Sequence, residues 1–466
     1  MVVRLLLKIF SPNSFTPERR YILGVLFNYF WGIDYEIECD AGIKSTFIYC
    51  ENGCVEIPDV FLGGSEGKWL TKESLPHVPL DVIDISFDGL DIKQMSVIFG
   101  RTNDDGQYIK IEDRKAYLGV DIFGSAFFML TRYEEIVIKK RDGYDRFPVE
   151  ESLAYKESFL TRPIINEYTE ILWKLLKHVS PDLQRKEKIY RVIPTHDIDK
   201  PFGMVYDSPV QMLRHFASDL IVKKSLKQTC KRFRDLCRMI LAKDSYIEEK
   251  KETFKFILQQ SCKHNLKDVF FFMNTKASWR DGNYTVDEPE VLDLIKELVH
   301  EGHFIGLHPS FVSYADKCEI CSETMEINKI LGKAGCKGIV GARQHYLKWK
   351  NPDTWQFYEN AGIPFDSTMT YAGHVGFRAG ICYPYPVFNL MTRKGLNLIE
   401  RPLIVMDGSL YDYMKLSHDE ALLKIKELAD ECKKYNGEFI LLWHNTMLDK
   451  NGERAFYKNM LAAVCD

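Results

Sequence analysis

The sequence predicts an α/β protein, with a C-terminal distorted (β/α)7-type barrel preceded by a smaller α+β domain. Its 466 residues exceed what one hydrophobic core usually serves, which indicates two domains. In the second half, short apolar runs alternate with helical segments, an order typical of parallel strands joined by helices. The first half mixes helical and strand patterns. We therefore expect domains at residues 1–183 and 184–466, divided within the polar run SPDLQRKEK.

The N-terminal domain combines helical and strand-like segments. The apolar patch in MVVRLLLKIF predicts a first strand, and a helix is expected over Thr16–Phe30. The runs STFIYCENGCVEI and FFMLTRYEEIVIKK are bounded by turn residues and predict short strands, and the segment RYEE predicts a structural ion-pair cluster. A helix follows Pro163 in PIINEYTEILWKLLKHV. None of these segments carries a chemical signature, so the role of residues 1–183 is left open.

Seven apolar segments of the C-terminal half predict parallel strands. Between them lie amphipathic helices such as EPEVLDLIKELVHEG, whose apolar residues recur on one face. This number of β/α units suggests a barrel. The predicted strands are KIYRVIPTHD, KDVFFFMNT, HFIGLHPS, KGIVGARQH, IPFDST, LNLIERPL and GEFILLWHN.

The charge balance indicates a neutral or small partner. Lys and Arg total 62 against 66 Asp and Glu, and the net charge of −4 gives no reason to expect a nucleic-acid partner. No stretch approaches the roughly 20 apolar residues of a membrane span, and the N-terminal patch is too interrupted for a signal peptide. We expect a cytoplasmic protein without an integral membrane segment.

A basic insertion follows the first predicted strand of the barrel. Residues 209–243 contain nine Lys or Arg against two Asp, with apolar residues at helical spacing. A solvated helical hairpin packed on the barrel is the favoured interpretation. The alternatives are a basic lid over an anionic substrate and a helix lying on a membrane surface.

Ionisable residues follow directly after five of the predicted strands. In parallel β/α barrels the carboxyl ends of the strands share one rim, where chemistry gathers. These residues therefore predict a single convergent site. They are His196, Asp197 and Asp199, then His308, then Arg343 and His345, then Asp366, and finally His444.

The first of these segments, THDID, carries two carboxylates. Asp197 and Asp199 are two residues apart, so they share a face if the strand continues. A divalent cation removes their repulsion, with one carboxylate binding the metal and the other free to take a proton from water. Alternatively, Asp199 caps the following turn. His303, an odd number of residues before His308, is expected to be a structural histidine.

With these residues assembled, the C-terminal half resembles the polysaccharide deacetylase family, the carbohydrate esterases of family 4. The resemblance runs in order through THDID, GHFIGLH, GARQHY, FDST and LLWH, over roughly residues 186–466. More narrowly, the whole chain resembles a bacterial branch of polysaccharide-deacetylase-like proteins with an extra N-terminal domain, through FFMLTRYEE and RQHYL.

The resemblance implies a role for each matched residue. Asp197 would be the general base, Arg343 would orient it, and His444 would be the general acid. Asp199 and His308 would bind the metal, Zn²⁺ or another divalent transition metal. We assign Tyr346, Asp366 and His196 to substrate binding.

One position departs from the family pattern. A second histidine ligand is expected four residues after His308, where this chain has Val312. Candidate replacements are His345, which we favour because it ends another strand, and His196, with Ser310 a weaker ligand. A catalytic zinc site needs about three protein ligands.

The expected function is a metal-dependent hydrolase that removes acetyl groups, N-acetyl in the first place, from a bacterial glycan or glycan precursor. The alternative is a catalytically altered, metal-poor barrel that binds glycans or acts as a scaffold, with Val312 as its indication. A glycosidase using Asp197 and a second acid is a third hypothesis. The sugar, the acyl position and the oligomeric state are left open.

Overall fold

The computed structural model describes residues 6–51, 53–222, 226–275, 278–450 and 452–465. The chain forms two compact units. The first comprises residues 1–191, 369–404 and 431–438, and the second comprises residues 192–368, 405–430 and 439–466. Residues 1–5 of the predicted first strand and residues 223–225 of the basic insertion lie outside the described residues.

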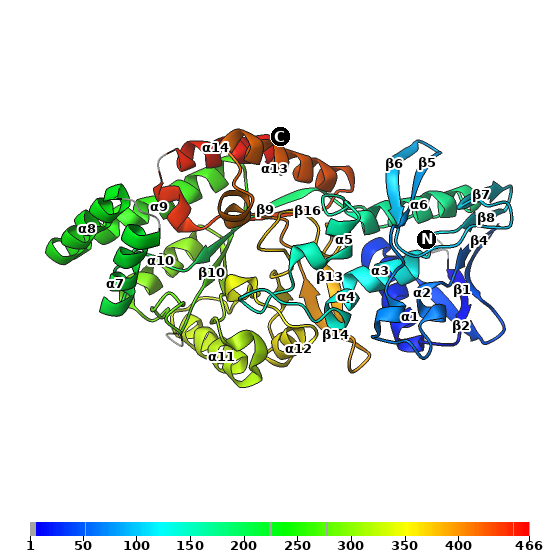
Figure 1. Ribbon diagram of the computed structural model, residues 1–466, viewed down its shortest axis with the longest axis horizontal. Coiled ribbons are helices and arrows are strands. Elements are labelled where there is room, and N and C mark those ends of the chain that lie inside the picture. The colour runs from blue at the N-terminus through cyan, green and yellow to red at the C-terminus, as the bar shows by residue number, and fades with distance from the viewer. Residues whose placement is uncertain (1–5, 52, 223–225, 276–277, 451, 466) are drawn as a thin grey trace. The chain divides into compact units, whose positions relative to one another are not determined.

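The first unit contains a six-stranded mixed sheet in the order β2-β1-β3-β4-β8-β7 (Figure 1). β3 and β4 form the hairpin predicted from STFIYCENGCVEI. Ile9, Ile48 and Val55 from three neighbouring strands are buried and form one face of this sheet. The strands of the unit are β1 (Leu7–Pro12), β2 (Tyr35–Asp40), β3 (Ser45–Cys50), β4 (Gly53–Pro58), β7 (Ile109–Glu112), β8 (Lys115–Leu118) and the hairpins β5 (Asp81–Phe87) with β6 (Leu90–Val97) and β13 (Tyr385–Asn389) with β14 (Lys394–Glu400).

Helices cover the buried face of this sheet. The long helix α6 confirms the prediction after Pro163, and α1 with the π-helix η1 confirms the predicted helix over Thr16–Phe30. The helices are α1 (Thr16–Leu23), η1 (Gly24–Trp31), α2 (Phe61–Gly64), η2 (Lys72–Ser74), α3 (Ile122–Leu130), α4 (Tyr133–Val137), η3 (Val149–Glu151), α5 (Leu153–Lys156) and α6 (Ile164–Val179).

The strand predicted over FFMLTRYEEIVIKK is wrong, because α3 and α4 occupy this segment. All nine residues of α3 are buried, so its sequence lacks the polar face that reveals a helix. The predicted ion-pair cluster is confirmed. Arg132 donates to Glu134 at 2.7 Å and to Glu135 at 2.9 Å, and Arg378 donates to Glu135 at 2.6 Å.

The second unit is built on a parallel sheet in the order β11-β10-β9-β16-β15. β10 reads VFFF and is buried at every position, as expected for a strand covered on both faces. Ala342 bridges in parallel to Leu307 and to Asp366, which continues the sheet beyond β11. The strands are β9 (Arg191–Ile198), β10 (Val269–Phe272), β11 (Phe304–Leu307), β12 (Phe365–Asp366), β15 (Val405–Met406) and β16 (Glu438–Leu442).

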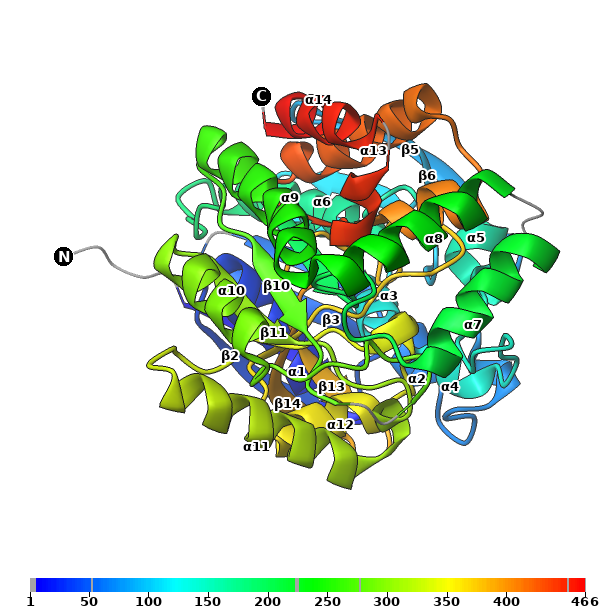
Figure 2. The ribbon, with the colours of Figure 1, turned by 90° about the vertical axis from the view of Figure 1, so that its left-hand side faces the viewer.

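Helices flank these strands. α9 and α10 lie beside β10 and β11 (Figure 2), and α13 lies next to α14 in both views (Figures 1 and 2). The helices are α7 (Pro209–Ala217), η4 (Ser218–Val222), α8 (Leu226–Leu241), α9 (Lys243–Lys263), α10 (Pro289–His300), η5 (Ser313–Ala315), α11 (Lys317–Lys333), η6 (His345–Leu347), α12 (Asp353–Asn360), η7 (Ser409–Tyr413), α13 (His418–Lys434), η8 (Asn445–Asp449) and α14 (Glu453–Cys465). None of the described helices combines the length and apolar character needed to cross a membrane.

The architecture is mixed α/β, and the pairings above do not establish a closed barrel. Two of the seven predicted strands differ. KGIVGARQH forms only the isolated bridges at Ala342. LNLIERPL forms β14, which pairs antiparallel with β13 in the first unit. β16 pairs in parallel with β15, a strand of only two residues, which is too short to give a sequence pattern.

The predicted division at residues 183 and 184 stays a prediction. The compact units differ from it in two segments, since residues 369–404 and 431–438 belong to the first unit. Tyr21, for example, donates a hydrogen bond to the carbonyl of Pro386 at 2.8 Å, and Arg393 donates to Glu18 at 2.6 Å. Such long-range contacts carry no local sequence signal.

Candidate metal centre

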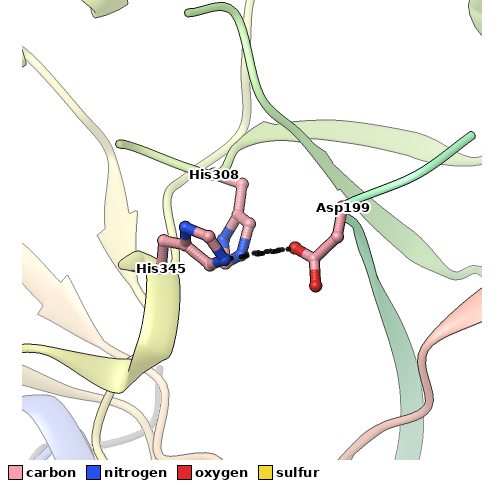
Figure 3. A group of neighbouring side chains, drawn as sticks. All are labelled: Asp199, His308 and His345. Atoms are coloured by element: carbon pink, nitrogen blue, oxygen red, sulfur yellow. Dashed lines mark ion pairs between the residues drawn. The ribbon is translucent and has the colours of Figure 1, made fainter. Parts of the chain in front are cut away.

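Three side chains from separate segments of the second unit converge on one point. Asp199 follows β9, His308 follows β11, and His345 lies three residues after the bridging Ala342. One ligand atom from each of the three lies within 4.8 Å of the others. Figure 3 shows both imidazole rings facing the carboxylate. Oδ1 of Asp199 lies 3.4 Å from Nε2 of His308 and 3.6 Å from Nε2 of His345.

The outer nitrogen of each histidine is already engaged. Nδ1 of His308 lies 2.5 Å from the carbonyl oxygen of Arg343, and Nδ1 of His345 lies 3.0 Å from Oδ1 of Asp281. Because both partners are acceptors, each Nδ1 carries the proton, and each Nε2 directs a lone pair at Asp199. Such outer-sphere partners are typical of metal-binding histidines.

The donor set fits a divalent transition metal. Oδ1 of Asp199 is buried and has no hydrogen-bond partner among the described residues. A cation between the carboxylate oxygen and the two imidazole nitrogens would offset the cost of burying this unpaired oxygen. Two imidazoles and one carboxylate are a common catalytic zinc set. Asp199, His308 and His345 are therefore the residues that could hold such a metal.

The charges around this group favour an ionised Asp199. Burial raises its pKa, but the neighbouring His308, His345 and His444 outweigh burial and hold the pKa well below its usual range. Burial lowers the pKa of His308, but Asp197 and Asp199 outweigh it and raise the pKa above its usual value.

Asp197 lies beside the group and is held by Arg343. The guanidinium donates to Oδ1 of Asp197 at 3.0 Å and to Oγ1 of Thr195 at 2.7 Å. It also donates to the carbonyl and the hydroxyl of Ser367, each at 2.9 Å, and its plane lies over the ring of Phe271. Arg343 is fully buried, so these contacts fix its position. Oδ2 of Asp197 is 3.8 Å from Nε2 of His308.

His444 approaches from the end of β16. Its Nδ1 lies 2.7 Å from Oδ1 of Asp407, and its backbone N–H donates to Oδ2 of the same residue at 2.7 Å. Its Nε2 lies 3.9 Å from Oδ2 of Asp199. Burial lowers the pKa of His444, but Asp407 and then Asp199 and Asp197 outweigh it and raise the pKa to about 10. The imidazole is therefore protonated at neutral pH.

Two glycines allow these segments to approach one another. A Cβ on Gly282 would lie 2.0 Å from the carbonyl oxygen of Asp199, so only glycine lets the loop of Asp281 pass this close to β9. A Cβ on Gly341 would lie 2.5 Å from the ring of Phe365. The backbone that carries Arg343 and His345 therefore packs directly on β12.

Two residues assigned to substrate binding lie elsewhere. His196 is fully buried, its ring stacks on Phe270 at 4.9 Å, and its Nδ1 lies 2.7 Å from the carbonyl of Trp443. The side chain of His196 points away from that of Asp197, because neighbouring residues of a strand alternate between its two faces. Asp366 is also buried. It accepts hydrogen bonds from Trp355 at 3.1 Å and from the backbone of Thr368 at 2.9 Å. Neither position supports the predicted contact with substrate.

The remaining predicted residues lie as follows. The ring of Tyr346 packs against His345 and against Phe311, with centroids 4.6 and 5.2 Å apart. Val312 is 45% exposed, and the third side chain of the group that could hold a metal is His345. His303 accepts the backbone N–H of Asp268 at 3.0 Å, which confirms a structural role.

Two carboxylates of the site were not predicted. Asp281 and Asp407 orient His345 and His444, respectively. The pair Asp281-Gly282 is the only sequence signal for the first, because Asp-Gly marks a tight turn after β10. Asp407 follows β15, which was not predicted either.

Comparisons with known proteins add the following. Residues 7–181 match a family of unknown function, DUF7033. The chain is similar to the crystal structure of a protein from Mycobacterium smegmatis assigned as a polysaccharide deacetylase, with 17% identity and a TM-score of 0.40 over 60% of this chain and 85% of that one. It is also similar to a family 4 carbohydrate esterase from Streptomyces lividans in complex with acetate, with 12% identity and a TM-score of 0.28 over 46% and 81%. No curated protein matches the chain.

Proposed function

We propose that this protein is a metal-dependent hydrolase that removes acetyl groups, preferentially N-acetyl groups, from a bacterial glycan or glycan precursor in the cytoplasm. The observation that carries the proposal is the group of Asp199, His308 and His345, whose ligand atoms lie within 4.8 Å of one another. The order of the motifs along the chain, which resembles that of polysaccharide deacetylases, supports the substrate class.

Asp199, His308 and His345 would hold the metal. A bound divalent metal polarises the acetamide carbonyl and lowers the pKa of a bound water, which supplies a nucleophile at neutral pH. The hydrogen bonds of both Nδ1 atoms keep the two imidazoles in the required tautomer.

Asp197 accepts the proton of the attacking water. Its Oδ1 is occupied by the hydrogen bond from Arg343, so the proton arrives at Oδ2. Arg343 is a positioning residue, because its guanidinium holds this carboxylate in place by the hydrogen bond at 3.0 Å. General bases held in this way accelerate proton transfer by roughly 10²–10⁴-fold.

His444 donates a proton to the departing amine. Asp407 holds Nδ1, so the proton leaves from Nε2, which faces Asp199. The pKa of about 10 keeps the imidazole charged until the amine departs. Near this group, the ring of Tyr346 beside His345 offers an apolar face on which a sugar ring can stack.

Metal analysis of the purified protein tests the proposal. After incubation with zinc, the protein is expected to retain one equivalent of metal and to release acetate from acetylated glycans. The variant Asp199→Ala should lose both, whereas His418→Gln, which alters a histidine paired with Glu453, should keep both. Metal-free wild-type protein after zinc incubation would overturn the proposal and favour a metal-poor glycan-binding protein. Release of reducing ends in place of acetate would indicate a glycosidase.

A further inference from the structure

The helical insertion formed by α7, η4 and α8 exposes an unusual amount of apolar surface. Eight of the 24 large hydrophobic side chains that are exposed among the described residues lie here. Their exposed fractions range from 48% to 83%. This density, in a short segment, marks an interaction surface. The eight residues are Val210, Leu213, Leu220, Ile221, Leu226, Phe233, Ile240 and Leu241.

These residues are arranged in stripes. In the first helical stretch, Val210, Leu213 and Ala217 follow at steps of three and four residues, and Ile221 continues the series. In α8, Leu226, Phe233 and Ile240 are seven residues apart, which is close to two helical turns. Each stretch therefore presents one exposed apolar stripe.

The insertion is strongly basic, whereas the whole chain is not. Residues 209–243 contain nine Lys or Arg and two Asp, a net charge of +7 in a chain whose net charge is −4. On α8, Lys231, Arg234 and Arg238 are exposed at steps of three and four residues. Their positions place them around the helix from the apolar stripe, on its polar side, which makes α8 a basic amphipathic helix.

We propose that the helical insertion binds an anionic lipid surface. The apolar stripe would enter the boundary between headgroups and acyl chains, and the basic side chains would contact lipid phosphates. A second copy of the chain is disfavoured as the occupant, because two segments of charge +7 repel each other. The anionic surface complements both the charge and the apolar stripes.

The insertion is attached to the loop that orients His345. Nε2 of Gln211, on α7, donates to the carbonyls of Trp279 at 3.2 Å and of Asp281 at 3.3 Å. The guanidinium of Arg214 lies 4.5 Å from the centroid of the Trp279 ring. If the proposed function holds, on which this step rests, an acetylated glycan attached to a lipid is the substrate class that such an arrangement serves.

Vesicle binding tests the proposal without any catalytic readout. The full chain is mixed with vesicles of phosphatidylglycerol and phosphatidylcholine, and with vesicles of phosphatidylcholine alone, and bound protein is measured by co-sedimentation. We expect at least about 10-fold stronger binding to the anionic vesicles, and weaker binding as salt is raised from about 50 to about 500 mM. Equal or absent binding would overturn the proposal.

Two variants and a matched control make the test specific. The triple variant Leu213→Ser, Phe233→Ser and Ile240→Ser, and the charge variant Lys231→Glu with Arg234→Glu, should each reduce binding at least about 10-fold. The control Met325→Ser with Leu423→Ser removes side chains that are 68% and 70% exposed on α11 and α13, and should bind like wild type.

The remaining outcomes separate the two proposals. If the triple variant binds anionic vesicles as strongly as the wild type does, the proposed lipid-binding surface is wrong. It is also wrong if the wild-type protein forms a dimer in solution and the triple variant does not. Bound vesicles without acetate release would contradict the proposed function and leave the lipid surface standing.

Discussion

Asp281 accepts a hydrogen bond from Nδ1 of His345 at 3.0 Å across 64 residues of sequence. The same oxygen accepts the backbone N–H of Phe311 at 2.9 Å, so one carboxylate fixes both an imidazole and the segment that follows His308. This contact decides the direction of the His345 lone pair. It also joins two of the three segments that carry the candidate ligands.

We expect the variant Asp281→Asn to bind zinc about 10–100-fold more weakly, because a neutral amide cannot support the ligand basicity of His345. The measurement is a competition titration with a chromophoric chelator. Asp287→Asn, which alters an exposed carboxylate in the next turn, serves as the control. Unchanged affinity in Asp281→Asn would show that Asp281 does not act on a metal ligand.

The variant Asp407→Asn is expected to move the alkaline limb of the pH–rate profile. The pKa of His444 is about 10 with Asp407 as its partner, and a general acid is active only below its pKa. Loss of the Asp407 carboxylate lowers the pKa of His444. The activity of the variant should therefore begin to fall at a pH on the order of 2 units lower than that of the wild type. An unshifted limb accompanied by a uniform loss of rate would assign Asp407 a purely structural role.

Glu323 should make stability depend on pH. Burial, the first cause, raises the pKa of this carboxyl to about 7, and Asp281 adds to it. A folded-state pKa above the unfolded value of about 4.3 means that the contribution is present at low pH and is lost as pH rises through about 7. The variant Glu323→Gln has no ionisable group at this position, so its stability should not decrease in this way. Its amide oxygen can still accept the backbone N–H of Ser310, which Glu323 accepts at 3.0 Å in the wild type.

Chemical denaturation measures this difference. Relative to wild type, Glu323→Gln should gain on the order of 3 kcal/mol of unfolding free energy between about pH 4.5 and about pH 8. Glu326→Gln alters an exposed residue of the same helix and should show no such trend. A gain that is equal at both pH values would contradict the raised pKa.

The variant Gly282→Ala should damage the candidate centre without touching a ligand. The added methyl would lie 2.0 Å from the carbonyl oxygen of Asp199, so β9 or the Asp281 loop must move. We expect zinc affinity to fall by at least about 10-fold, as when supporting groups are displaced. In α11, Gly332→Ala meets nothing within 4 Å and provides the control. Equal zinc affinity in both variants would refute the close approach.

Part of the site could be predicted from local sequence. Asp199, His308 and His345 each follow an apolar segment, and all three carry the ligand atoms of the candidate centre. The alternation of side chains along a strand also separates Asp197 from His196, because neighbouring residues point to opposite faces. The buried position of His196 follows from this alternation. For Asp366 the local pattern is that of a turn-capping carboxylate as much as of a substrate-binding one, and its substrate role stays a prediction.

The β/α order of the second unit and the residue types at its strand ends could be predicted from sequence, because strand and helix periodicities are local properties. Long-range contacts, in contrast, set which carboxylates orient the histidines, and they pair β14 antiparallel with β13. These features depend on contacts between residues far apart in the chain, such as Asp281 with His345. The local pattern of one segment does not indicate which distant segment it contacts.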